Sequence, residues 1–304
     1  MTTRDRLLAV TVAVAWGLNF IAIDQALTHF PPFLLVAVRF AVMAVPTVLL
    51  VPWPRVRWTW WLLYGVGFGV LQFGFLFAAM ASGMPTGVAS LVLQSSAPFT
   101  VLLGAAFLRE RLSRRQALGI GVAVVGLAVV GLHRAQAASW VPFALTLCAG
   151  LGWALGNIGS RQARPEHPMH LMLWMTVVPP LPMFAVSWFV EGRDAVTSSL
   201  STVLTPDALP ALLGPTYVVL IGTVVGSGLW TSLLARHPSS VVAPFSMLVP
   251  VVGLTAAAVL LGERVDPTEV VGAALVVAGV GWASTTARRR RAAPTTGLEQ
   301  PVRA

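Results

Sequence analysis

Two asparagines lie inside strongly apolar stretches, each shortly after a tryptophan. Asn19 follows Trp16, and Asn157 follows Trp153. A side-chain amide offers two N–H donors and one acceptor oxygen, which suits a dipolar ligand that carries both an ammonium and a carboxylate group. The alternative is a hydrogen bond between helices, which is often worth only about 0.6 kcal/mol. The two tryptophan–asparagine pairs are therefore candidate ligand contacts.

Polar residues also precede two prolines at the same spacing. Gln94 lies four residues before Pro98, and Ser246 lies four residues before Pro250. A proline frees the carbonyl four residues earlier, and in hydrocarbon that carbonyl needs a partner, water or a cavity. A kink without a cavity is the alternative, because proline is common in membrane helices. We predict that both prolines break their helices beside a polar cavity.

Further candidates are a glutamine and a tryptophan in other apolar stretches, Gln72 and Trp230. An indole ring can hold an ammonium group by cation–π attraction, or it can simply pack between helices. The predicted substrate-binding residues are Trp16, Asn19, Gln72, Gln94, Trp153, Asn157, Trp230 and Ser246.

Arg39 is the one basic residue well inside an apolar stretch, and Asp24 lies near the end of the preceding stretch. Placing an arginine at the centre of a membrane helix costs about 2.5–3.5 kcal/mol. An ion pair with Asp24 would lower this cost, whereas a substrate carboxylate would be bound by the guanidinium in a fork. Both interpretations stay open, and Asp24, Arg39, Pro98 and Pro250 form the predicted gating and helix-break set.

The elements that carry these residues are membrane helices. Of the 304 residues, 56% are hydrophobic and 10% charged, whereas a soluble domain has about 25% charged residues. A helical span needs about 20 apolar residues, and the sequence contains ten such stretches. The predicted spans cover residues 7–27, 33–51, 59–81, 86–107, 116–133, 140–160, 169–190, 210–234, 240–261 and 267–286.

The arginines predict the orientation of these spans. The net charge is +9 and there is no lysine; sixteen of the 20 basic residues fall on one side of the spans and three on the other. The positive-inside rule then places both termini in the cytoplasm, and residues 288–304 form a disordered cytoplasmic tail. Short clusters between apolar stretches control topology, and we expect no nucleic-acid partner.

The second half of the chain repeats the first. Trp16, Pro98 and Glu110 correspond to Trp153, Pro250 and Glu263, at offsets of 137, 152 and 153 residues. Each half holds five predicted spans, and because five is odd the two halves have opposite orientations. Inverted repeats of this kind enclose the binding sites of many secondary transporters. We predict an all-α membrane protein with repeats at 1–135 and 136–287 around a central cavity.

Three stretches resemble the EamA family of the drug/metabolite transporter superfamily: Ala15–Phe20, Gly83–Gln94 and Val242–Leu254. The resemblance implies a bacterial inner-membrane exporter with ten helices, a central cavity and alternating access. It suggests cysteine, O-acetylserine or related amino-acid-like metabolites as cargo. Aromatic amino acids, nucleobases or cationic drugs on the same fold remain the alternative, favoured by the tryptophan-rich middle of the chain.

Catalytic motifs are missing from the sequence. It has no H-E-x-x-H, G-x-S-x-G or P-loop motif, so we expect no enzyme activity, metal or cofactor. No carboxylate lies at mid-depth in any predicted span, which disfavours proton antiport through a midplane glutamate. The expected partners are a small-molecule substrate and the lipid bilayer, and we expect the chain to function as a monomer.

Overall fold

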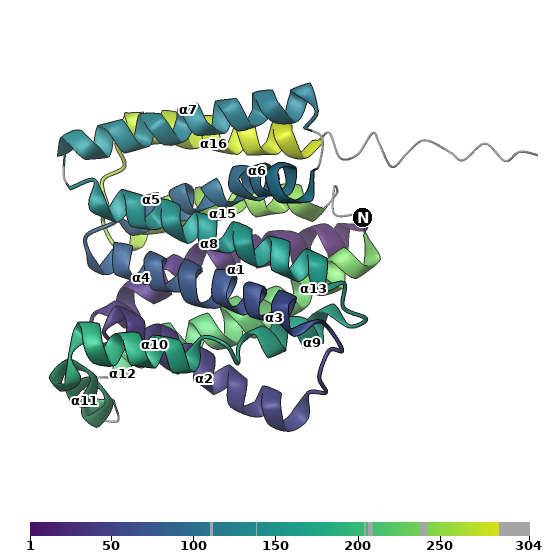
Figure 1. Cartoon of the computed structure of the whole chain (residues 1–304). Coiled ribbons are helices and arrows are strands. Elements are labelled where there is room, and N and C mark those ends of the chain that lie inside the picture. Colours follow the sequence, from purple (N-terminus) through teal and green to yellow (C-terminus); the bar gives the residue numbers. More distant parts are fainter. Residues whose placement is uncertain (110–111, 138, 204, 206–208, 238–241, 286–304) are drawn as a thin grey trace, which may run out of the picture.

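The computed structural model describes residues 1–109, 112–137, 139–203, 205, 209–237 and 242–285. Within these ranges the chain is helical, without a strand (Figure 1). Eight helical stretches are long and apolar enough to cross a membrane, and two shorter apolar helices cover Phe245–Leu260 and Pro267–Ala283. The ninth predicted span starts at residue 240, outside the described residues, as does the predicted tail at 288–304.

The first half contains five helical stretches. They are α1 (Thr3–Leu27), α2 (Pro32–Leu50), α3–η1–α4 (Trp58–Tyr64, Gly65–Gln72, Phe73–Ala81), α5–η2–α6 (Thr86–Val92, Leu93–Ser95, Ser96–Leu108) and α7 (Arg114–Ala137). Helix α1 begins where it does because the Thr2 hydroxyl oxygen accepts the Asp5 backbone N–H at 3.1 Å, which satisfies one of its free donors. Helix α2 begins with a proline, a residue favoured in the first turn.

The described part of the second half is arranged similarly but includes a helix, α11, without a counterpart in the first half. Its elements are α8 (Val141–Ala163), α9 (Pro168–Met175), α10 (Pro180–Val186), η3 (Ser187–Glu191), α11 (Arg193–Thr202), α12 (Leu209–Tyr217), η5 (Val218–Val225), α13 (Gly226–Arg236), η6 (Ala243–Met247), α15 (Leu248–Leu260) and α16 (Pro267–Thr285). Helix α11 was not expected from the sequence. The seventh predicted span, residues 169–190, is divided between α9 and α10, which begins at Pro180.

Corresponding helices of the two halves are interrupted in the same way. The third stretch contains the π-helical segment η1, and the eighth contains the π-helical segment η5. The fourth and ninth stretches contain the 3₁₀ segments η2 and η6, which end three residues before Pro98 and Pro250. A π-helical segment exposes backbone groups that a regular helix would satisfy, and such segments are frequent at functional sites.

Glycines allow two helix pairs to approach closely. Helices α7 and α16 lie side by side in Figure 1, and a Cβ on Gly126 would lie 2.7 Å from the Gly272 carbonyl oxygen. Helix α8 packs on η1 in the same manner, since a Cβ on Gly152 would lie 2.7 Å from the backbone nitrogen of Gln72. Close backbone approach at small residues is typical of membrane helices, and the α8 contact fixes the position of Gln72.

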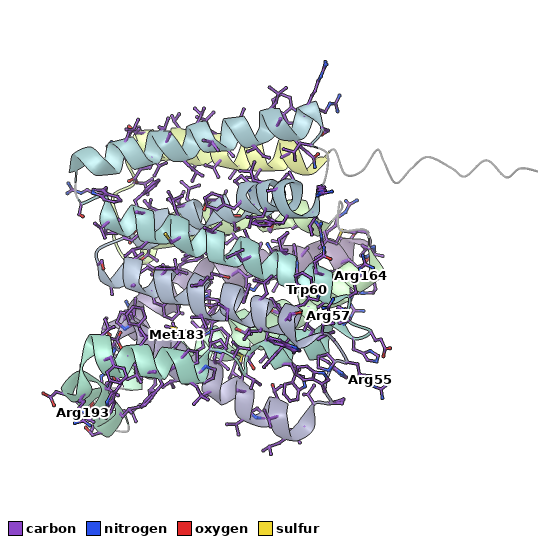
Figure 2. The ribbon with its side chains drawn as sticks, in the orientation of Figure 1. Arg55, Arg57, Trp60, Arg164, Met183 and Arg193 are labelled. Carbon is purple, nitrogen blue, oxygen red and sulfur yellow. The ribbon has the colours of Figure 1, made fainter. Side chains whose placement is uncertain are left out.

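The two ends of the bundle differ in charge. Arg55, Arg57 and Arg164 lie at one end in Figure 2, and Arg193 lies at the opposite end. The N-terminus and the last described turn of α16 are at the arginine-rich end (Figure 1). Because these two points lie at the same end, the chain between them crosses the bundle an even number of times.

Candidate binding cavity

A cavity of about 880 Å³ opens among the helices of both halves. All eight residues selected from the sequence as ligand contacts line it: Trp16, Asn19, Gln72, Gln94, Trp153, Asn157, Trp230 and Ser246. Arg39 lines it as well. Asp24, Pro98 and Pro250 are not among the lining residues, so the prolines affect the cavity through helix shape and not through contact. The volume suits a small metabolite.

The π-helical segment η5 anchors one wall of the cavity. The Trp16 indole N–H donates to the carbonyl oxygen of Gly222 at 2.8 Å, and the Trp16 ring lies 5.2 Å from the ring of Trp230. Asn19, one turn further along α1, faces the same glycine, because a Cβ on Gly222 would meet its Oδ1 atom. The Asn19 Oδ1 atom is buried and has no hydrogen-bond partner.

Arg39 lies in the cavity wall and is 5% exposed. Its Nη2 donates to the Thr223 hydroxyl oxygen at 3.1 Å, and its guanidinium carbon lies 3.9 Å from the centre of the Phe73 ring. Its Nε and Nη1 atoms are buried without a partner. Thr223 belongs to η5, so this segment contacts both α1 and α2.

Arg39 and Asp24 do not form the ion pair that the sequence suggested as one of two possibilities. Asp24 instead accepts from the Thr86 hydroxyl at 3.4 Å and from the Gln25 amide at 3.3 Å. Asp24 therefore faces α5, whereas Arg39 turns toward the aromatic rings and the cavity. Within the described part of the chain, Arg39 is a buried cation without a carboxylate partner.

Further lining residues come from η1 and α8. Gln72 is 3% exposed, and its Oε1 atom is buried without a partner. Asn157 donates from Nδ2 to the Thr100 hydroxyl oxygen at 3.1 Å, and the Trp153 ring meets Phe68 edge-on at 6.0 Å. The two asparagines thus differ, because the Asn157 amide already donates a hydrogen bond to Thr100 of α6, whereas the Asn19 oxygen has no hydrogen-bond partner.

These groups give the cavity a mixed electrostatic character. Leaving a buried donor or acceptor unsatisfied costs about 1–3 kcal/mol, so unpartnered polar atoms in a cavity wall are suited to binding a ligand or water. The wall offers free N–H donors on a cation at Arg39, and free acceptor oxygens at Asn19 and Gln72. Aromatic rings line much of the remaining surface.

Sequence reasoning missed the residues at the arginine-rich end of the cavity. Ser160, His167, Met169, His170 and Met172 line it at the end of α8 and the start of α9. The His167 and His170 rings lie 5.0 Å apart. Because these residues fall at helix ends, no local pattern separates them from an ordinary connecting loop.

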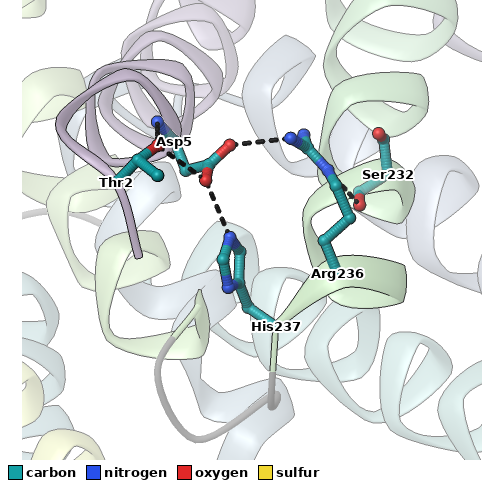
Figure 3. Close-up of polar contacts among 5 residues, drawn as sticks. All are labelled: Thr2, Asp5, Ser232, Arg236 and His237. Carbon is teal, nitrogen blue, oxygen red and sulfur yellow. Dashed lines mark hydrogen bonds and ion pairs between the residues drawn. The ribbon is translucent and has the colours of Figure 1, made fainter.

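An ionic cluster around the buried Asp5 joins α1 to the end of α13 (Figure 3). Asp5 is 5% exposed; its Oδ1 accepts from Arg236 at 2.8 Å and its Oδ2 contacts His237 Nε2 at 2.9 Å. In the sequence, Arg236 contributed only to the prediction of orientation, and Asp5 carried no signal at all.

Two glutamates cap helices of the first half from the second half. Glu191 accepts the backbone N–H groups of Phe33 and Leu34, at 2.7 and 3.2 Å. Glu263 accepts those of Thr86 and Gly87, at 2.7 and 3.0 Å. The residues that precede α2 and α5 are prolines without a side-chain cap of their own. Glu110, which corresponds to Glu263, lies outside the described residues.

Comparison with known proteins places this arrangement in a family. The model of the EamA-like transporter family matches residues 6–132 and again residues 140–285. The chain belongs to the EamA-like transporter family. This EamA-like protein is accordingly a membrane transporter and not an enzyme, with a small-molecule substrate and a lipid environment. The double match also shows that the chain consists of two repeats.

Similar proteins include bacterial transporters over most of their length. A probable amino-acid metabolite efflux pump of Salmonella typhimurium is 42% identical, over 92% of this chain and 94% of that protein. Its counterpart in Escherichia coli is 39% identical, with the same shares covered. A probable terminal-alkyne amino-acid exporter of Streptantibioticus cattleyicolor is 32% identical, over 70% of this chain and 69% of that protein.

One crystal structure shares the fold of this EamA-like transporter. It covers 96% of this chain and 100% of the chain in that structure, with a TM-score of 0.54 at 19% sequence identity. At this identity the likeness concerns only the arrangement of the helices.

Proposed function

We propose that this EamA-like transporter exports small amino-acid-like metabolites across the bacterial cytoplasmic membrane. The observation that carries the proposal is the cavity, in which two nitrogens of the Arg39 guanidinium and two amide oxygens are buried without hydrogen-bond partners. Such a wall suits a ligand with both an acidic and a basic group. The printed names of the relatives, which describe amino-acid metabolite efflux and amino-acid export, support the same cargo class. Cysteine and O-acetylserine are the first candidates.

We further propose ten transmembrane helices in two inverted repeats, residues 1–135 and 136–287, with both termini in the cytoplasm. The two family matches and the paired interruptions of corresponding helices support the duplication. The arginine-rich end, which also carries the N-terminus, supports the orientation. The transporter acts as a monomer, because both repeats contribute to a single cavity.

Transport follows alternating access, in which the two repeats rock about the cavity. The irregular segments beside Pro98 and Pro250 supply the points where helices of both halves bend. Gln94 and Ser246 lie at these segments and line the cavity. At the arginine-poor end, the Glu191 and Glu263 contacts hold the two halves together.

The double variant Asn19→Ala with Asn157→Ala tests the cavity. We expect efflux of labelled cysteine or O-acetylserine from loaded proteoliposomes to fall at least about tenfold, which corresponds to about 1.4 kcal/mol. Thr255→Ala is the matched control, since Thr255 is an exposed polar residue on α15. Parental transport by the double variant would show that the cavity assignment is wrong.

A second cargo class is favoured by the Trp16–Trp230 ring contact at the cavity. Aromatic amino acids, nucleobases or cationic drugs would stack on these rings. Expression of the protein should then confer resistance to aromatic analogues or cationic dyes, whereas the leading proposal predicts resistance to toxic concentrations of cysteine.

A further inference from the structure

We propose that Arg39 binds the carboxylate of the substrate, and that the side-chain oxygens of Asn19 and Gln72 bind its ammonium group. This inference rests on the proposed export function and specifies how the cavity recognises its cargo. It predicts that a ligand needs both groups, so that neither an amine without a carboxylate nor an acid without an amine is a good substrate.

The state of Arg39 is the first argument. A buried charge is costly unless it is paired, and the described carboxylate nearest along the chain, Asp24, is bound to Thr86 and Gln25 instead. The Thr223 hydroxyl and the Phe73 ring hold the guanidinium in place. Two of its three nitrogens, Nε and Nη1, remain without partners. A carboxylate would accept from one of these donors, alone or together with the second hydrogen of Nη2, and would neutralise the charge.

The positions of the free acceptors are the second argument. Thr223, which holds Arg39, directly follows Gly222, whose missing Cβ leaves space for the Asn19 oxygen. Gln72 directly precedes Phe73, whose ring lies against the guanidinium. The two free oxygens belong to residues that line the same cavity as Arg39. An acceptor oxygen repels a carboxylate and attracts an ammonium group, so the wall has complementary ends for a zwitterion.

The expected difference in affinity between ligands follows from the hydrogen-bonding groups of the cavity that a ligand leaves unsatisfied. A ligand that lacks the carboxylate leaves the Arg39 donors and charge buried and unpaired. The loss of a hydrogen bond to a charged group costs about 1.5–3 kcal/mol, which corresponds to roughly 10- to 150-fold in affinity. The cavity thus selects for a ligand type by the cost of leaving its own groups unpaired.

The test uses three matched probes and the purified full-length protein in detergent micelles. L-Cysteine carries both groups, cysteamine lacks the carboxylate, and 3-mercaptopropionate lacks the amine. L-Phenylalanine, phenethylamine and 3-phenylpropionate form a second set for an aromatic cargo. Binding is measured by isothermal titration. We expect the amino acid of at least one set to bind the parent protein at least tenfold more tightly than its amine and its acid.

Variants then assign each group. Arg39→Gln should weaken binding of the amino acid and the acid at least tenfold while leaving binding of the amine within twofold. Asn19→Ala and Gln72→Leu should weaken the amino acid and the amine and leave the acid unchanged. Arg39→Lys, which retains the charge, should preserve part of the carboxylate preference. Arg57→Gln, which removes an exposed arginine, should leave all three affinities unchanged.

Several outcomes would overturn the proposal. They are equal binding of amine and amino acid by the parent protein, no binding of any of the six probes, or equal weakening of all three ligand types by Arg39→Gln. The last result would indicate a purely structural role for Arg39. Failure of the export function itself has a different signature, because the parent protein would then bind the amino acid without accelerating its loss from loaded proteoliposomes.

Discussion

Gly222 illustrates how one residue shapes the cavity. Its carbonyl oxygen accepts the Trp16 indole N–H, and its missing side chain makes room for the Asn19 oxygen. The residue lies in the π-helical segment η5, where backbone hydrogen bonding departs from the regular pattern. A single glycine therefore positions two predicted ligand contacts on α1, and a methyl group there should disturb ligand binding more than stability.

Gly222→Ala should lower transport of an amino-acid substrate about tenfold, equivalent to about 1.4 kcal/mol, because the new Cβ displaces the Asn19 amide. The melting temperature should change little, since the displaced atom is the end of a flexible side chain. Gly228→Ala is the control, because its Cβ would meet only Met169 Cε at 3.9 Å. Substrate efflux and thermal unfolding are measured together. Normal transport by Gly222→Ala would argue against a role for Asn19.

Helices α2 and α5 depend on residues far along the chain for their first hydrogen bonds. Each follows a proline that supplies no side-chain cap, and each receives a glutamate carboxylate from the other half instead. A carboxylate at a helix N-terminus satisfies free N–H groups and interacts favourably with the helix dipole. The caps thus act at the level of elements, by joining helices of one repeat to the connections of the other.

Glu191→Gln and Glu263→Gln should each lower the free energy of unfolding by about 1 kcal/mol, the usual magnitude for a lost cap. The two caps serve different helices, so the double variant should lose about 2 kcal/mol. Unfolding in a denaturing detergent measures both effects. Glu166→Gln removes an exposed carboxylate and should have no effect. An equally small effect at all three positions would show that these caps contribute nothing to stability.

At the scale of the whole molecule, the uneven distribution of arginine predicts orientation. Arg55 and Arg193 mark the opposite ends of the bundle (Figure 2), and the positive-inside rule assigns the arginine-rich end to the cytoplasm. Cys148 is the single cysteine of the chain, so a cysteine-free background requires one substitution.

In a Cys148→Ala background, Arg193→Cys should react with a membrane-impermeant maleimide that is added to intact cells and reaches the outer face of the cytoplasmic membrane. Arg55→Cys should react only after lysis. The reason is that the reagent reaches only the outer face until the membrane is broken. Labelling is read on gels after affinity purification, with the Cys148→Ala protein as the blank. The reverse pattern would place both termini outside the cytoplasm.

The sequence permits good prediction of what depends on local pattern. Apolar length and proline or glycine boundaries indicate the spans, because lipid requires each crossing helix to satisfy its own backbone. Polar residues within those spans are costly in lipid and so turn inward, which explains why Asn19, Gln72 and Asn157 all line the cavity. Asparagine and glutamine were informative because they are so rare in these stretches.

Contacts between distant spans could not be predicted in the same way. The partner of Arg39 is Thr223, 184 residues away, and Asp5 and Arg236 are 231 residues apart. Neither pair has a spacing that a helix period would reveal. The π-helical segments were also missed, because no residue type marks them and neighbouring helices decide whether they form.

The origin of the two caps has a consequence for how the protein is made. Phe33 and Glu191 are 158 residues apart, and Thr86 and Glu263 are 177 apart. When α2 and α5 first enter the bilayer during translation, the carboxylates that complete them have not yet been synthesised. The N-terminal repeat therefore lacks these two helix caps until the second half has been synthesised. Produced alone, that repeat would be a target for membrane proteases, and simultaneous production of the missing partner should rescue it.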